Sequence, residues 1–303
     1  MFKKVCIIGC GLIGSSISRA IKKNKLAGKI VSSNRSDVTN KKIITLNVVD
    51  EASSDTKKMV QGSDLVIIAT PLSSYKDVIL KIKSSLKNGA ILTDVGSVKK
   101  KIISLIENKI PKNISWISSH PIAGTENSGP EAGFASLFEG RWCVITPTDD
   151  TSESAIDQVT NLWRRVGSKV DIMTPAHHDK VLAITSHIPH LIAFNIVGTV
   201  ADLEDDTKME AVKYAAGGFR DFTRIAASDP EMWRDVFMEN REAVLEMLGR
   251  FNEDLSSFQK AIRNNDLKFL ESKFSKSKEI RKLIEDLGQA GTFDPTESKK
   301  SRY

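Results

Sequence analysis

The feature that most constrains the fold of this 303-residue chain is a glycine pattern, Gly9-x-Gly-x-x-Gly14. It follows a short apolar run at residues 4–8 and opens a stretch with helical periodicity. In such a turn Gly9 permits a tight bend, Gly11 lets the backbone approach a pyrophosphate, and Gly14 allows close helix–strand packing. The pattern therefore predicts dinucleotide binding at a helix N-terminus. The alternative is a glycine-rich turn in an unrelated sheet.

Short apolar runs alternate with helical stretches, near 75–87 and 98–108, through the first 174 residues. This alternation predicts an α/β fold with a doubly wound parallel (Rossmann-type) sheet. The expected strands are residues 4–8, 29–33, 64–69, 90–94, 114–118, 142–146 and 170–173.

After Pro175 the sequence has only helical periodicity, as at residues 180–200, 232–251 and 265–287. We therefore expect an all-helical second domain. The predicted domains are a dinucleotide-binding domain (1–174), a helical substrate and dimerisation domain (175–290) and a frayed tail (291–303).

The composition argues against several classes of partner. The net charge of +6 is spread thinly apart from residues 299–302, so no nucleic-acid patch is expected. Cys6, Cys10 and Cys143 have no CxxC spacing, which indicates neither a disulfide framework nor a zinc site. With no signal peptide and no apolar run approaching about 18 residues, we expect a cytoplasmic protein without a membrane partner.

The second predicted strand should end in a residue that reads the adenosine ribose. Asn34 stands where an NAD site would normally carry Asp or Glu, and the next carboxylate is Asp37. Arg35 suits a 2′-phosphate, which favours NADP over NAD, unless it is an ordinary solvated charge. The expected cofactor-binding residues are Gly9, Gly11, Leu12, Ile13, Gly14, Ser33, Asn34, Arg35, Ser36, Thr70 and Pro71.

A polar loop at residues 119–129 (SHPIAGTENSG) combines a histidine with several hydrogen-bonding side chains. All five histidines fall between positions 120 and 190. His187 and His190 look like a metal pair at first, but they lack the HExxH spacing, so we expect no metal.

A second polar segment lies at residues 216–233, in the predicted helical domain. Its Arg224 could present a guanidinium to a ligand carboxylate in a bidentate fork. The alternative is an internal arginine–carboxylate pair with a structural role.

Five separated motifs occur in one order: GCGLIG, DVGSVK, SHPIAGTENSG, SHIPH and GGFRDFTRIAASDPEMWRD. In this order the chain, from residue 4 to about 285, is similar to the prephenate and arogenate dehydrogenases (cyclohexadienyl dehydrogenases) of tyrosine biosynthesis. The resemblance implies a monofunctional enzyme and a homodimer built through intertwined helices.

The resemblance also implies the reaction. Prephenate, arogenate or both would undergo oxidative decarboxylation to 4-hydroxyphenylpyruvate or tyrosine, with hydride transfer from C4 to the nicotinamide. His120 matches the catalytic base that takes the C4 hydroxyl proton, a role suited to a group with an ordinary pKa of about 6.5. Ser97 is implied as a hydrogen-bond partner of that hydroxyl or of His120.

The same resemblance implies the substrate pocket. His190 and Arg224 would hold the substrate carboxylates, and His178 and Trp233 would act as pocket or gating residues. The preference between prephenate and arogenate stays open. The implied pocket residues are Thr125, Glu126, His178, His190, Arg224 and Trp233.

Two alternative classes of protein join a dinucleotide domain to helices. A β-hydroxyacid dehydrogenase or imine reductase is one, although the hydroxyacid enzymes typically use a helical lysine as the acid–base group. A non-enzymatic NADP-sensing regulator is the other, and it would not need Ser97, His120, His190 and Arg224 together.

Overall fold

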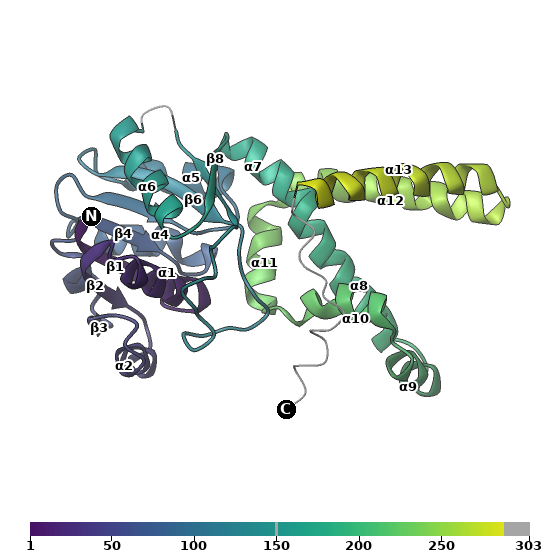
Figure 1. Cartoon of the computed structure of the whole chain (residues 1–303), viewed down its shortest axis with the longest axis horizontal. Coiled ribbons are helices and arrows are strands. Elements are labelled where there is room, and N and C mark those ends of the chain that lie inside the picture. Colours follow the sequence, from purple (N-terminus) through teal and green to yellow (C-terminus); the bar gives the residue numbers. More distant parts are fainter. Residues whose placement is uncertain (149–150, 288–303) are drawn as a thin grey trace. The chain divides into compact units, whose positions relative to one another are not determined.

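The computed structural model describes residues 1–148 and 151–287 (Figure 1). The chain divides into two compact units, Met1–Leu245 and Glu246–Tyr303. The tail expected at 291–303, with its basic run, lies outside the described residues.

The first unit is built on an eight-stranded sheet in the order β3-β2-β1-β4-β5-β6-β7-β8. Neighbouring strands pair in parallel from β3 across to β6, and β7 pairs with β8 in parallel. The pair β6–β7 is antiparallel, so the sheet is mixed, whereas the sequence predicted a parallel one. The strands are β1 (Phe2–Ile8), β2 (Ala27–Ser33), β3 (Glu51–Ser53), β4 (Leu65–Ile68), β5 (Ile91–Asp94), β6 (Ser115–Pro121), β7 (Trp142–Thr146) and β8 (Lys169–Ile172).

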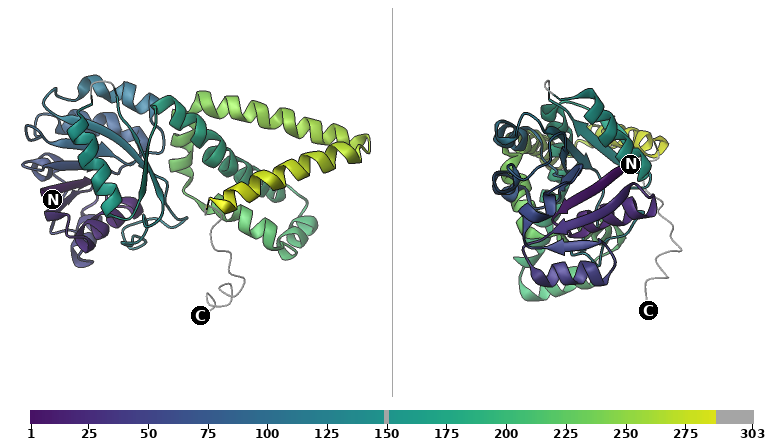
Figure 2. Two further views of the ribbon diagram at one scale, coloured as in Figure 1. Left: turned by 45° about the horizontal axis from the view of Figure 1, so that its top comes forward. Right: turned by 90° about the vertical axis from the view of Figure 1, so that its left-hand side faces the viewer.

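Helices cover both faces of this sheet (Figure 2). On one face, Ile17 of α1 and Val159 of α6 pack with the buried side chains of β1 and β4. On the other, α3, α4 and α5 pack together with Trp233 and Val236 of α11, a helix from the later part of the chain. The helices up to β8 are α1 (Leu12–Lys23), α2 (Asp37–Thr45), α3 (Thr56–Val60), α4 (Tyr75–Ile82), α5 (Lys100–Ile106) and α6 (Glu153–Arg165).

After β8 the secondary structure of the described chain is helical, which confirms the all-helical segment expected there. The single helix expected over 232–251 is interrupted at Asn240, which ends α11 with φ −103° and ψ 29°. The elements are α7 (Pro175–Leu182), the π-helical turn η3 (Ala183–His187), α8 (Ile188–Ala201), α9 (Asp205–Lys213), α10 (Gly217–Thr223), the 3₁₀ turn η4 (Arg224–Ala227), α11 (Pro230–Glu239), α12 (Arg241–Arg263) and α13 (Leu267–Asp286).

The continuous helical stretch Pro175–Ala201 is more apolar than the sequence expectation allowed. A window of 18 residues within it has a mean hydropathy of 1.5, which makes the helix long and apolar enough to cross a membrane by length and composition alone. That criterion is weak for a single helix, since the core helix of a soluble protein meets it too. This stretch also carries four of the five histidines of the chain, His177, His178, His187 and His190.

Candidate active site

The glycine-rich turn after β1 forms an open cradle. Gly9 has φ +88°, and a Cβ there would lie 2.6 Å from the carbonyl oxygen of Ala69. A Cβ on Gly14 would collide with the carbonyl of Gly9, whereas a Cβ on Gly11 would meet nothing within 4 Å. The turn thus needs glycine at two positions for the backbone path and leaves the third open to a ligand, which fits a dinucleotide pyrophosphate.

The cradle lies where the strand order reverses, between β1 and β4. Thr70 and Pro71 follow β4 and therefore lie at the same carboxyl edge, where open α/β sheets bind ligands. Helix α1, which contains Leu12 and Ile13, begins here with no side-chain cap and no acidic residue in its first turn. Its first N–H groups are therefore available to an anion.

The residues expected to read the ribose follow β2, the other neighbour of β1. Asn34 is already engaged, because its Oδ1 accepts the amide of Cys10 at 2.6 Å and its Nδ2 donates to Asn40 Oδ1 at 3.0 Å. Ser33 Oγ donates to Thr56, 3.0 Å away. Asn34 therefore braces the glycine turn through its side chain.

The two residues that follow Asn34 have different environments. Ser36 Oγ accepts the amide of Thr39 and caps α2. Arg35 is exposed and forms no ion pair with any of the residues described. It is the free cation of this segment.

His120 lies inside β6, which ends three residues later than the strand expected to end at Ser118. The residue is 9% exposed, and its Nδ1 lies 2.9 Å from Nε2 of His178 on α7. The structure therefore brings together two residues of the predicted site that are 58 positions apart in the sequence.

Behind His178 lies Asp179, which the sequence analysis did not single out. Nδ1 of His178 is 2.8 Å from Oδ1 of Asp179. The same carboxylate accepts the backbone amides of Lys99 and Lys100 at 2.8 and 2.9 Å. Asp179 thus joins α7 to the start of α5.

A buried ion pair joins the ends of β5 and β6. Lys99 Nζ donates to Asp94 Oδ2 at 2.8 Å and to the carbonyl of Ser119 at 2.5 Å. Both side chains are inaccessible to solvent, and burial lowers the pKa of Lys99 while the Asp94 carboxylate opposes that shift. Both residues belong to the DVGSVK motif, which was the available sequence signal for them.

The surroundings keep His120 neutral. Burial holds its pKa well below the ordinary value, and the positive charges of His178, Lys99 and His187 would act in the same direction. Burial also lowers the pKa of His187 to about 4. An imidazole that is neutral at pH 7 can accept a proton, as a general base must.

His190 and Trp233 form the next part of the site. Their rings stack with centroids 3.7 Å apart, and His190 Nδ1 donates to the carbonyl of Ser186 at 2.8 Å. Burial lowers the pKa of His190, and the charge of Arg224 adds to the effect. The Nε1 of Trp233 and the Nε2 of His187 are buried without a hydrogen-bond partner among the described residues.

Arg224 in η4 reaches back to the polar loop after β6. Its Nη1 lies 2.8 Å from Oε2 of Glu126, and the two side chains are 59% and 34% exposed. Thr125 is exposed and accepts the amide of Asn127, while Ser97 is half-buried after β5. Within the described part of the chain no hydrogen bond joins Ser97 to His120.

Comparison with known proteins gives one consistent result. The family model for the prephenate dehydrogenase nucleotide-binding domain matches residues 17–172, and that for the prephenate dehydrogenase dimerization domain matches residues 174–276. The chain is 37% identical over 281 residues to cyclohexadienyl dehydrogenase from Zymomonas mobilis, covering 93% of this chain and 96% of that protein.

Solved structures give the same result. Prephenate dehydrogenase from Aquifex aeolicus, in complex with hydroxyphenyl propionate and NAD+, superposes with a TM-score of 0.87 at 33% identity, covering 94% of this chain and 99% of that one. Synechocystis arogenate dehydrogenase gives 0.76 at 26% identity, over 93% and 99% of the two chains. The glycine cradle, the buried imidazole and these matches together show that the chain belongs to the prephenate dehydrogenase family.

Proposed function

We propose that this chain catalyses the oxidative decarboxylation of prephenate, arogenate or both, with hydride transfer to a nicotinamide cofactor, in tyrosine biosynthesis. Membership of the family makes the chain an oxidoreductase of this type. It also decides against the β-hydroxyacid dehydrogenase, imine reductase and regulator alternatives. The observation that carries the assignment of the site is His120, a buried neutral imidazole at the carboxyl edge of the sheet that holds the glycine cradle.

In the proposed mechanism His120 accepts the proton of the substrate C4 hydroxyl. The bound nicotinamide supplies the hydride acceptor. Loss of the proton and of hydride turns C4 into a carbonyl carbon. When the ring carboxylate leaves as CO₂, the electron pair of the broken bond enters the ring, which becomes aromatic, and the C4 oxygen takes a proton to become the phenol hydroxyl. Burial serves this step, because it keeps His120 unprotonated before the substrate arrives.

The other pocket residues would orient the substrate. Arg224 and His190 would hold its carboxylates, and Ser97 would hydrogen-bond the C4 hydroxyl or His120. Because Arg224 is paired with Glu126 in this structure, the guanidinium must exchange that partner, or share it, when a carboxylate binds. The remaining proposed lining residues are Thr125, His178 and Trp233.

The nucleotide-binding domain and the glycine cradle imply a nicotinamide cofactor. We propose NADP as the preferred form. Two features support it: no carboxylate stands at Asn34, and the guanidinium of Arg35 is exposed and unpaired among the described residues. The NAD+ in the A. aeolicus structure is bound to that enzyme, and our proposal of NADP over NAD is made for this chain alone.

One assay tests the activity and the cofactor together. Purified protein is mixed with prephenate or arogenate and with NADP or NAD, and reduced nicotinamide is followed by its fluorescence. We expect turnover with at least one substrate and higher kcat/KM with NADP. No turnover in any of the four combinations would contradict the proposed activity.

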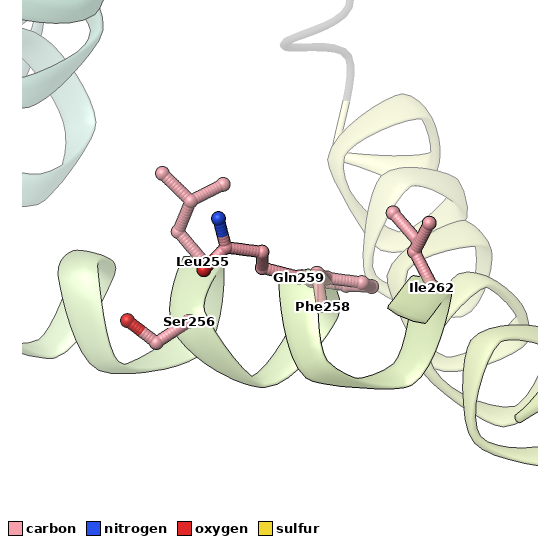
Figure 3. Close-up of a pocket in the computed structure, with 5 residues that line it drawn as sticks. All are labelled: Leu255, Ser256, Phe258, Gln259 and Ile262. Carbon is pink, nitrogen blue, oxygen red and sulfur yellow. The ribbon is translucent and has the colours of Figure 1, made fainter. Parts of the chain in front are cut away.

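We also propose a homodimer formed through the helical region. The match to a dimerization domain at residues 174–276 supports it, as do exposed apolar side chains such as Ile196 and Val197 on α8. On α12 a shallow pocket is lined by Leu255, Phe258 and Ile262, among other residues (Figure 3). Such surfaces favour association. A compact monomer at micromolar concentration in sedimentation velocity would contradict the proposal.

A cytoplasmic location is proposed from the cysteines. Cys6, Cys10 and Cys143 are buried and free, as expected in a reducing compartment.

A further inference from the structure

We infer that His178 and Asp179 are positioning residues that fix the tautomer of His120, so that Nδ1 of His120 carries the proton and Nε2 is the basic atom. This inference rests on the proposed role of His120 as the base. It assigns to His178 a task other than lining or gating the pocket.

The assignment starts from the Asp179 carboxylate. Its two oxygens receive the backbone amides of Lys99 and Lys100, and an amide can only donate. The carboxylate is therefore the acceptor in this cluster, and Nδ1 of His178, 2.8 Å from Oδ1, must be the donor. A neutral imidazole that donates through Nδ1 has its lone pair on Nε2.

Nε2 of His178 in turn fixes the position of the proton on His120. Nε2 of His178, now an acceptor, lies 2.9 Å from Nδ1 of His120. Nδ1 of His120 must therefore hold the hydrogen, and in the neutral ring Nε2 keeps the lone pair. No hydrogen bond among the described residues uses that Nε2, so it is available to a substrate hydroxyl.

The opposite tautomer of His120 carries its proton on Nε2 of His120. It requires a protonated His178 that donates a hydrogen bond to Nδ1 of His120. Lys99, Asp94 and Asp179 face His178, and His178, Lys99 and His187 face His120. Burial, the largest effect, lowers the pKa of His178, although Asp179 opposes the shift. Neutral His178 is therefore the stable form near pH 7.

Hydrogen bonds on two sides hold the backbone that carries His178 and Asp179. Thr174 caps the start of helix α7, because its hydroxyl accepts the amide of His177, and Pro175 is the first residue of the helix. The carbonyl of Asp179 accepts Nδ2 of Asn240, which lies between α11 and α12. His178 and Asp179 thus sit on backbone that is hydrogen-bonded at its start and at its far side.

Nuclear magnetic resonance tests the tautomer without reference to activity. Protein labelled with ¹⁵N-histidine gives distinct two-bond and three-bond correlations for Nδ1–H and Nε2–H imidazoles. His120→Asn identifies the signals of His120 by their loss. We expect His120 as the Nδ1–H tautomer at pH 7.5, and an Nε2–H tautomer would overturn the inference.

Paired substitutions of His178 test the consequence for turnover. In His178→Gln the amide oxygen reaches about as far as Nε2 and can accept the Nδ1 proton of His120, whereas the shorter His178→Asn cannot. We expect kcat to fall about 10- to 100-fold further in His178→Asn than in His178→Gln, with KM for cofactor unchanged. His177→Gln, at the exposed neighbouring position, is the matched control and should leave kcat unchanged.

The outcomes separate this inference from the proposed function. Equal kcat values for the Gln and Asn variants, with the Nδ1–H tautomer kept in both, would overturn the positioning role while the dehydrogenase activity stands. An unmodified protein that turns over neither substrate would instead contradict the proposed function, whatever tautomer His120 adopts.

Discussion

The side chain of Asn34 holds the backbone amide of Cys10, with 2.6 Å between Oδ1 and N. Cys10 lies within the glycine cradle, so the residue expected to read the ribose supports the turn that would bind the pyrophosphate. We therefore expect the choice between NADP and NAD to depend chiefly on the neighbour of Asn34, the exposed Arg35.

Replacing Arg35 with alanine should weaken NADP binding and leave NAD binding nearly unchanged. A charge-assisted contact to the 2′-phosphate contributes about 1.5–3 kcal/mol, which is roughly 10- to 100-fold in affinity. Titration of both cofactors against the unmodified and Arg35→Ala proteins measures the difference. If the unmodified protein already prefers NAD tenfold or more, the assignment of Arg35 is wrong.

Asn34→Asp should lower stability as well as change cofactor preference. The carboxylate keeps the bond from Cys10, but it loses the donor to Asn40 Oδ1 and places two acceptors together. We expect a loss of about 1–3 kcal/mol in the free energy of unfolding, measured by urea denaturation. The Arg35→Ala protein serves as the control, since no ion pair of Arg35 exists to be lost within the described chain.

His120→Asn should reduce kcat about 10²- to 10⁴-fold, the range for loss of a general base. Cofactor affinity should stay the same, because the glycine cradle is untouched. Steady-state kinetics near neutral pH, with cofactor binding measured separately, checks both statements. A loss of less than about threefold would show that another group removes the proton.

Arg224→Ala should act on substrate binding. The guanidinium is 59% exposed in its pair with Glu126, so the pair itself contributes little to stability. Loss of the contact to a substrate carboxylate should raise KM by about 10- to 100-fold, with cofactor affinity unchanged. A KM that stays normal for both substrates would leave Arg224 with a structural role.

The buried histidines should make the fold sensitive to mild acid. His187 has a folded pKa of about 4, so below pH 6.5 the unfolded chain binds a proton that the folded protein rejects. Stability should fall as the pH drops from 6.5 toward 4, by up to about 1.4 kcal/mol per pH unit for this residue. Urea denaturation across that range measures the slope, and His187→Gln should have a shallower one.

Several parts of the structure were predictable from local sequence. The apolar run and the three glycines together predicted the first strand, turn and helix, because Gly9 and Gly14 each meet a local steric requirement. The histidine at position 120 was identified by its motif. The domain boundary near residue 174 and the roles of the site residues stay predictions.

Other parts depend on contacts that leave no local pattern. An apolar run does not reveal strand direction, so the antiparallel pairing of β6 with β7 was missed. The bond from the Lys99 amide to Asp179 spans 80 positions, and no local sequence pattern connects Lys99, which precedes α5, with Asp179 in α7. The interruption at Asn240 was missed for the same reason, since its side chain bonds to Asp179 and His187 far earlier in the chain.

Helix α11 has a consequence for how such a protein can evolve. It lies beyond position 229, yet Trp233 and Val236 are buried with Leu72 and Tyr75 in the core on one face of the sheet. A nucleotide-binding half ending near 174 would keep α3, α4 and α5 on this face but would expose the apolar side chains that Trp233 and Val236 cover, so the two halves are not fully independent modules. Any recombination that replaces the helical half must also supply a helix that covers this face.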